Sequence, residues 1–243
     1  MAVAMNDTTC SATGTGVSSL STAANTMAVS GADPALLVFA GVSAGTPPDF
    51  SGCTFNTNPT PTTVNLLLNT GAFRTYYRQA LYGLEGMSTD TDNITVNFTA
   101  SADEAYVGAC SLTGVDGTTG FGIVADDQLE AADTNTTSLS VTLSTIGSDD
   151  MLVDGVHGGY TAAPTYTAGA NQTAFNSAAV DAYVSGAMSY QSGSDGGVMS
   201  WSWTGNQRVG MIAVRVIAAA GGGGGLGIPI AAYHYNHNVG SNL

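Results

Sequence analysis

The chain has 243 residues, of which 44% are hydrophobic and 9% are charged, and its formal net charge is −14. It contains four arginines and no lysine, which argues against nucleic-acid binding because affinity for phosphate depends on clustered basic side chains. The same balance of charge argues against docking on an anionic membrane.

The first seven residues contain no basic segment followed by an apolar run, so no Sec-type signal peptide is predicted. The longest apolar stretch, residues 209–220, is interrupted by Arg215 and is shorter than the ~18 residues that a membrane helix needs. We therefore expect a soluble protein. The predicted location is the surface of a virion or of another extracellular particle, reached by lysis or by assembly.

Period-two alternation of apolar and polar residues dominates the chain, and it is clearest at residues 92–100. Further strands are predicted at 35–43, 62–68, 72–84, 104–115, 138–146, 150–156, 182–191, 198–204 and 208–218. One short helix is predicted at 125–133, and the span 158–177 is predicted to be a surface loop or a weak edge hairpin. About ten strands separated by turn residues indicate an all-β fold, an antiparallel two-sheet β-sandwich of the jelly-roll type.

The chain is predicted to form one β-sandwich (jelly-roll) domain at residues 1–220, a glycine joint at 221–225 and an extended C-terminal arm at 226–243. No internal repeat is visible in the sequence. The arm has apolar and aromatic side chains that are better buried on a neighbouring subunit than left in water. The predicted assembly contacts are Ile228, Ile230, Tyr233, His234, Tyr235 and His237.

The three cysteines, Cys10, Cys53 and Cys110, are too few for a disulfide framework, and none lies in a metal-binding pair. They are predicted to be small buried hydrophobic residues. A single bridge, Cys53 to Cys110 or Cys10 to either, is the alternative in an oxidising compartment.

Two patterns are typical of enzymes, and neither has the context that catalysis needs. Residues 41–45 match the G-x-S-x-G nucleophile elbow around Ser43, but Thr46 and two prolines follow where the motif requires a helix. Asp150 and Asp154 come closest to a glycosidase carboxylate pair, but Asp150 is interpreted as a turn residue. No catalytic residue is predicted, and the protein is not expected to be an enzyme.

Two other patterns suggest metal ligands. Residues 90–93 offer three oxygen side chains, fewer than a Ca²⁺ site needs, and they are interpreted as a solvated turn. His234 and His237 have a spacing that suits two metal ligands, but two ligands do not complete a site, and they are interpreted as contacts of the arm. No metal and no cofactor are predicted.

Aromatic residues suggest a second class of function, carbohydrate binding. Met199, Trp201 and Trp203 share one face of a strand, and they would form a sugar-stacking platform if they were exposed. The polar opposite face favours their burial. The tyrosines predicted to contact a glycan are therefore loop residues such as Tyr160, Tyr166 and Tyr190.

Three blocks of sequence resemble the concanavalin-like, jelly-roll β-sandwich domains of bacteriophage structural proteins and environmental surface proteins. The blocks are residues 36–43, residues 74–84 leading into 93–99, and residues 106–119. They are strand and turn signatures, and the resemblance covers most of residues 15–218. No catalytic residue comes with it.

The resemblance implies a non-enzymatic virion component, a capsid decoration or fibre/tail-associated module that assembles through its C-terminal arm. The expected partners are copies of itself and another virion or surface protein, with neither nucleic acid nor membrane. The alternative is a surface carbohydrate-binding module, whose partner is a glycan.

Overall fold

The computed structural model describes residues 1–23, 26–56, 60–72, 75–129 and 137–220. Antiparallel β-strands dominate these residues, which confirms the predicted all-β sandwich. Within the same ranges no helix has the length and apolar character needed to cross a bilayer. The jelly-roll connectivity stays a prediction, and the glycine joint and the arm lie outside the described residues.

A large sheet is built from the N-terminal half of the chain. Its strands are β1 (Ala4–Ser21), β3 (Ala35–Ser43), β4 (Phe50–Phe55), β5 (Thr62–Thr63), β6 (Asn65–Asn69), β7 (Tyr77–Glu85) and β9 (Ile94–Thr113). The order across the central part is β1-β9-β3-β7-β6. The first half of β9 continues beyond β3 and lies between β4 and the end of β1.

A second large sheet comes from the C-terminal half. Its strands are β10 (Phe121–Leu129), β12 (Met151–Tyr160), β14 (Thr173–Ala179), β15 (Val184–Ser192) and β17 (Gln207–Val216), in the order β10-β17-β12-β15-β14. A smaller sheet covers its outer face, with the order β11 (Ser138–Thr142), β16 (Val198–Ser202) and β13 (Thr167–Ala168). The remaining elements are the pair β2 (Met27–Val29) and β8 (Asp90–Asp92) and the short 3-10 helix η1 (Gly193–Asp195).

The two halves of the chain have the same strand order, so the structure contains a repeat that the sequence does not reveal. The order β1-β9-β3-β7-β6 of the first half corresponds strand by strand to β10-β17-β12-β15-β14 of the second half. The register agrees as well. Ser43 lies opposite Tyr77 and Glu104, and its counterpart Gly159 lies opposite Val184 and Arg208.

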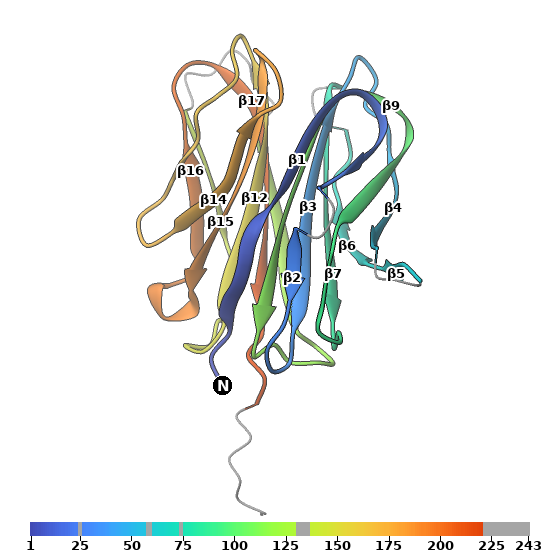
Figure 1. Cartoon of the computed structure of the whole chain (residues 1–243). Helices are drawn as coiled ribbons and strands as arrows, with labels where there is room; N and C mark the ends of the chain where they lie inside the picture. The colour runs from blue at the N-terminus through green and yellow to red at the C-terminus, as the bar shows by residue number, and fades with distance from the viewer. Residues whose placement is uncertain (24–25, 57–59, 73–74, 130–136, 221–243) are drawn as a thin grey trace, which may run out of the picture.

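The two large sheets pack face to face, as Figure 1 shows with the blue-to-green half beside the yellow-to-red half. Strand β3 packs on β12, β9 on β15, β7 on β17 and β1 on β14. A half-turn about an axis parallel to the strands exchanges the β9–β15 contact with the β7–β17 contact and maps the β3–β12 contact onto itself, so the central strands have approximate two-fold symmetry.

Two glycines allow the central strands to approach on this axis. The ring of Phe39 lies against Gly155, where an added Cβ would be 2.2 Å from Phe39 Cγ. The ring of His157 lies against Gly41, where an added Cβ would be 2.3 Å from His157 Cγ. In each pair a large side chain from one half fills the space that a glycine leaves in the other half.

Three apolar cores separate the layers of sheet. One lies between the two large sheets and contains Phe39, Tyr106 and Ile212. The others lie on the outer face of each large sheet. Because both faces of β3 and of β12 are covered, every residue of β3 and the first nine residues of β12 are buried.

Two predictions about local structure are wrong. Residues 125–129, predicted to begin a helix, belong to β10, because pairing with β17 overrides the local preference of an Asp-rich segment. The span 158–177 is neither a loop throughout nor a hairpin, since it contains the end of β12, all of β13 and the start of β14, and β13 and β14 pair in different sheets.

The predicted burial of the three cysteines is confirmed, since Cys10, Cys53 and Cys110 are all free and buried. The alternative of a single disulfide bridge is therefore wrong. Cys53 belongs to the outer core of the first half, whereas Cys110 belongs to the core between the two large sheets. The sheet itself therefore separates these two thiols.

The body has two distinct ends. Met1 donates a backbone hydrogen bond of 3.1 Å to the carbonyl of Ala219, so the first residue and the last described residues lie together, at the lower end in Figure 1. We call this the basal end. Ser43, Tyr160 and Arg208 lie at the opposite ends of their strands, and we call that end distal.

Candidate functional site

A pocket of about 210 Å³ opens at the distal end, where the two halves of the chain meet. Its lining residues are Ser43, Ala44, Gly45, Tyr76, Tyr77, Asp103, Glu104, Tyr183, Val184 and Arg208. We call it the distal pocket. Seven of these residues come from the first half and three from the second, so the pocket lies across the approximate two-fold axis.

The floor of the pocket contains a hydrogen-bonded serine and carboxylate. The Ser43 hydroxyl donates to Glu104 Oε2 at 2.5 Å, and the side chain of Ser43 is buried. Burial raises the pKa of Glu104, the Ser43 hydroxyl opposes the rise, and the nearby Asp181 and Asp103 raise it further. Asp103 Oδ2 also accepts a hydrogen bond of 3.3 Å from Gly45 N, which connects the acidic side of the pocket to the end of β3.

The opposite wall contains a guanidinium that lies on two tyrosine rings. Arg208 Cζ is 5.0 Å from the ring centre of Tyr76 and 4.1 Å from that of Tyr160. Both distances suit cation–π contacts, which stabilise an exposed pair by about 0.5–1 kcal/mol. The arginine, which lines the pocket, is therefore positioned by aromatic rings.

The tyrosines at the rim expose much of their surface. Tyr76 and Tyr183, which line the pocket, are 43% and 56% exposed. Tyr160 lies beside the pocket on the Arg208 guanidinium and is 45% exposed. The side chain of Asp181 fixes the turn before β15 by accepting hydrogen bonds from the backbone N–H groups of Tyr183 and Val184, at 2.7 and 2.8 Å. This turn holds Tyr183 at the rim.

A buried tyrosine connects the two halves beneath the pocket. The Tyr77 hydroxyl donates a hydrogen bond of 2.7 Å to the carbonyl of Gly159, at the end of β12. Burial raises the pKa of Tyr77 to about 12, so its hydroxyl stays protonated and remains a donor.

Sequence analysis found Ser43 and Tyr160 but not the rest of the site. Tyr76 and Tyr183, each one residue before a strand, are counterparts in the two halves, as are Glu104 and Arg208. This correspondence is the signal that could have found the pocket, but it is visible only once the strands are aligned by their pairing.

The sequence around Ser43 matches a nucleophile elbow but was not expected to be catalytic. In the structure, residues 44–49 form no helix after the strand β3. Ser43 ends β3 and donates its hydrogen bond to a carboxylate. A nucleophilic serine needs a base such as histidine. His157 is fully buried against Gly41, and burial lowers its pKa to about 3. Ser43 is therefore a part of the floor of the pocket.

Asp150 and Asp154, the two aspartates considered as a glycosidase pair, both accept hydrogen bonds from other residues of the body. Asp150 Oδ2 accepts a hydrogen bond of 2.7 Å from Arg215 Nε in an ion pair, and it also accepts from Gly147 N. Asp154 is fully buried and accepts hydrogen bonds from Ser189, Trp201 Nε1 and Gln172 Nε2. Burial raises the pKa of Asp154 to about 7 despite these donors.

Residues 90–93, interpreted from the sequence as a solvated turn, instead begin with the strand β8, which pairs with β2, and their carboxylates bind the local backbone. Asp90 Oδ1 accepts from Thr91 N, and Asp92 Oδ1 accepts from Asn93 N, both at 2.7 Å. Across the described ranges, no group of three or more His, Cys, Asp or Glu side chains is placed to hold a metal ion.

The predicted burial of the aromatic strand is confirmed, since Met199, Trp201 and Trp203 lie in the core beneath the small outer sheet. Of the tyrosines predicted to contact a glycan, Tyr160 lies beside the distal pocket, on the guanidinium of its lining residue Arg208, but does not itself line the pocket. Tyr166 is buried in the same core as the tryptophans, and the half-buried Tyr190 packs on Phe175.

The predicted assembly contacts lie outside the described residues, and their role stays a prediction. They are Ile228, Ile230, Tyr233, His234, Tyr235 and His237.

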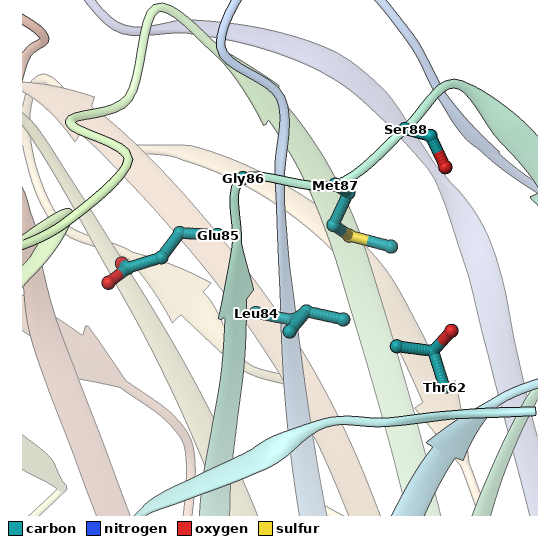
Figure 2. A pocket seen from close by; sticks show the side chains of 6 residues that line it. All are labelled: Thr62, Leu84, Glu85, Gly86, Met87 and Ser88. Carbon is teal, nitrogen blue, oxygen red and sulfur yellow. The ribbon is translucent and has the colours of Figure 1, made fainter.

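A second hollow, of about 220 Å³, differs from the distal pocket in its chemistry. Figure 2 shows that Leu84 and Met87 extend toward Thr62, whereas Glu85 points to the opposite side. This alternation follows from the strand geometry of β7. The hollow is therefore bounded by both polar and apolar atoms, with Glu85 among its lining residues, and it lacks the arginine and the aromatic rings of the distal pocket.

Comparisons of the chain with models of protein families, with curated proteins and with solved structures found no match.

Proposed function

We propose that the protein is a non-enzymatic recognition module that binds a saccharide in the distal pocket. The observation that carries this proposal is the set of three half-exposed tyrosines, Tyr76, Tyr160 and Tyr183, around a positioned guanidinium and two carboxylates. Tyrosine rings offer flat apolar surface to the C–H faces of a sugar, while charged groups accept and donate hydrogen bonds to its hydroxyls.

The pocket suits recognition at a surface better than enclosure of a substrate. Its volume of about 210 Å³ is small, and its rim consists of residues that are still largely in contact with solvent. A single sugar residue fits such a space, with the neighbouring residues of a longer chain lying across the exposed rings. The proposal is therefore for binding within a polysaccharide or at its end.

A glycan array tests this function directly. We expect the full chain to retain a subset of saccharides, and Tyr76→Ala or Tyr183→Ala, at two tyrosines that line the pocket, to weaken that binding by about tenfold or more. Leu66→Ala is the matched control, because Leu66 is a large, 50% exposed residue that does not line the pocket. Retention of no saccharide, or an equal loss in the control, would contradict the proposal.

The virion-structural function expected from the sequence stays a second proposal, with capsid decoration or a fibre/tail-associated position as its forms. One observation favours display on a particle: the first residue and the last described residues lie together at the basal end, at the far end of the body from the pocket. Attachment through the basal end would leave the pocket facing outward. Mass spectrometry of purified particles tests this proposal, which requires the chain to be present among the particle proteins.

A further inference from the structure

The approximate two-fold axis relates the two sides of the distal pocket residue by residue. Tyr76 and Tyr183 occupy equivalent positions, and Glu104 of the first half is the counterpart of Arg208 of the second. The pocket is therefore symmetric in its backbone and in its two rim tyrosines, but its two charged positions have opposite sign.

On one side of the pocket a cation already lies on an aromatic ring. The Arg208 guanidinium of the second half contacts Tyr76 of the first half, with 5.0 Å between Cζ and the ring centre. Tyr160 covers the same guanidinium at 4.1 Å. This side shows that the rim tyrosines accept a positive charge in the geometry that the fold provides.

The symmetry-related side has the equivalent strand ends and the equivalent rim tyrosine, and no cation of the described residues lies on that ring. Here the counterpart of Tyr76 is Tyr183, which is 56% exposed, and the counterpart of Arg208 is the Glu104 carboxylate. Ala44 stands at the position equivalent to Tyr160, so a methyl group replaces a phenol ring and leaves space beside Glu104.

We infer that the distal pocket selects a saccharide bearing a free amine, with its ammonium group between the Tyr183 ring and the Glu104 carboxylate. The inference rests on the proposed saccharide binding and names the class of sugar. The ammonium then occupies the two-fold counterpart of the Arg208 guanidinium, and ring hydroxyl oxygens accept hydrogen bonds from Arg208 itself.

The charges around the pocket favour this ligand over a neutral or acidic one. Asp103 and Glu104 line the pocket, Asp181 lies close enough to affect Glu104 electrostatically, and Arg208 supplies one positive charge. The sum is negative, and the whole chain has a net charge of −14. A negative cleft attracts cations and repels the carboxylate of an acidic sugar.

Isothermal titration calorimetry of the full chain at about pH 6 and low salt tests the inference. The ligands are a tetramer of β-1,4-linked glucosamine, its N-acetylated form and a tetramer of galacturonic acid. We expect the free amine to bind about tenfold tighter than the acetylated form, and the acidic tetramer to bind weakest. Glu104→Gln should remove the preference for the amine. Glu85→Gln is the matched control, since Glu85 is a partly buried glutamate at the other hollow.

Each outcome separates this inference from the proposed function. A preference for the amine that is lost in Glu104→Gln and kept in Glu85→Gln supports the inference. Equal binding of the free and acetylated tetramers overturns it and leaves saccharide binding intact. Binding of none of the tetramers, together with an empty glycan array, overturns the proposed function as well. Circular dichroism of each variant establishes that it is folded before it is titrated.

Discussion

Single residues on the approximate two-fold axis explain why a repeated fold leaves so little trace in the sequence. Phe39 and Gly155 occupy equivalent positions and contact each other, as do Gly41 and His157. Two equal residues at either place would collide if large or leave a cavity if small, because protein interiors are close-packed. The two halves must therefore differ where they meet, and comparing their residues one by one hides the correspondence.

Gly41→Ala should destabilise the protein by about 3 kcal/mol, because the added methyl group would overlap the His157 ring. Adding His157→Ala removes that overlap. The double variant should therefore lose about 1–2 kcal/mol less stability than the two single variants lose together. Chemical denaturation of the four proteins measures this coupling. Gly52→Ala is the control, since no atom lies within 4 Å of its added Cβ. Additive effects would contradict the contact.

Asp154 should make stability depend on pH. Its pKa is raised to about 7 in the folded protein, above its ordinary value of 3.8. The folded state therefore holds a proton that the unfolded state releases between these values, and this contribution to stability is lost as pH rises from about 4 to about 7. Because an asparagine side chain does not titrate in this range, Asp154→Asn should not lose stability in this way.

The measurement is the free energy of unfolding of both proteins by urea at several pH values. The stability of Asp154→Asn relative to the parent should increase as pH rises from about 4 to about 7, by up to about 1.4 kcal/mol per pH unit. A difference that stays constant over this window would mean that Asp154 has an ordinary pKa.

At the scale of elements, strands with bulky apolar residues could be predicted and the others could not. The prediction for 35–43 matches β3 residue for residue, because this run of apolar side chains is covered on both faces. Strand β1 was not predicted: its inward side chains, such as Cys10 and Ala12, are small and give no strong alternation. The strands predicted at 92–100 and 104–115 are the single strand β9, joined because β1 pairs along both parts.

The candidate site could be predicted only in fragments, for a related reason. Ser43 was identified from a sequence motif and Tyr160 from its aromatic character. Glu104 and Arg208 are 104 positions apart and show no local pattern. Their presence in one pocket depends on the packing of β9 on β15 and of β7 on β17, strands of different sheets. Pairing between distant strands is what period-two alternation alone does not specify.

The turn before β15 provides a test at the element scale. Asp181→Ala removes the acceptor for the N–H groups of Tyr183 and Val184, so we expect a loss of about 1–2 kcal/mol in stability. Saccharide affinity should fall more in Asp181→Ala than in the control Asp195→Ala, which removes an acidic side chain from the exposed turn at η1. Thermal unfolding and titration calorimetry measure the two effects. Unchanged affinity in Asp181→Ala would mean that the turn does not position Tyr183.

At the scale of the whole molecule, the repeated halves create one site at one end and bring Met1 and the last described residues to the other. The distal pocket draws residues from both halves, and neither half alone contains both Glu104 and Arg208. The basal end holds the hydrogen bond between Met1 and Ala219. This arrangement suits a module that is held at one end and meets its ligand at the other.

Truncation after Ala220 tests the proposed division of roles between body and arm. We expect the shortened protein to fold with unchanged stability and unchanged saccharide affinity, because the described strands and the distal pocket all precede residue 221. Attachment to particles or to other copies should weaken. Analytical ultracentrifugation and co-sedimentation with particles measure this attachment. Unchanged attachment would mean that the arm does not make the assembly contact.

The most direct test of saccharide binding is a nuclear magnetic resonance titration of the isotope-labelled full chain with the tightest ligand of the array. The proposed function predicts that the largest chemical-shift changes occur at Tyr76, Tyr160, Tyr183 and Arg208, with little change at the basal end around Met1. Changes confined to the basal end or to the outer faces of the sheets, or no changes at all, would contradict it.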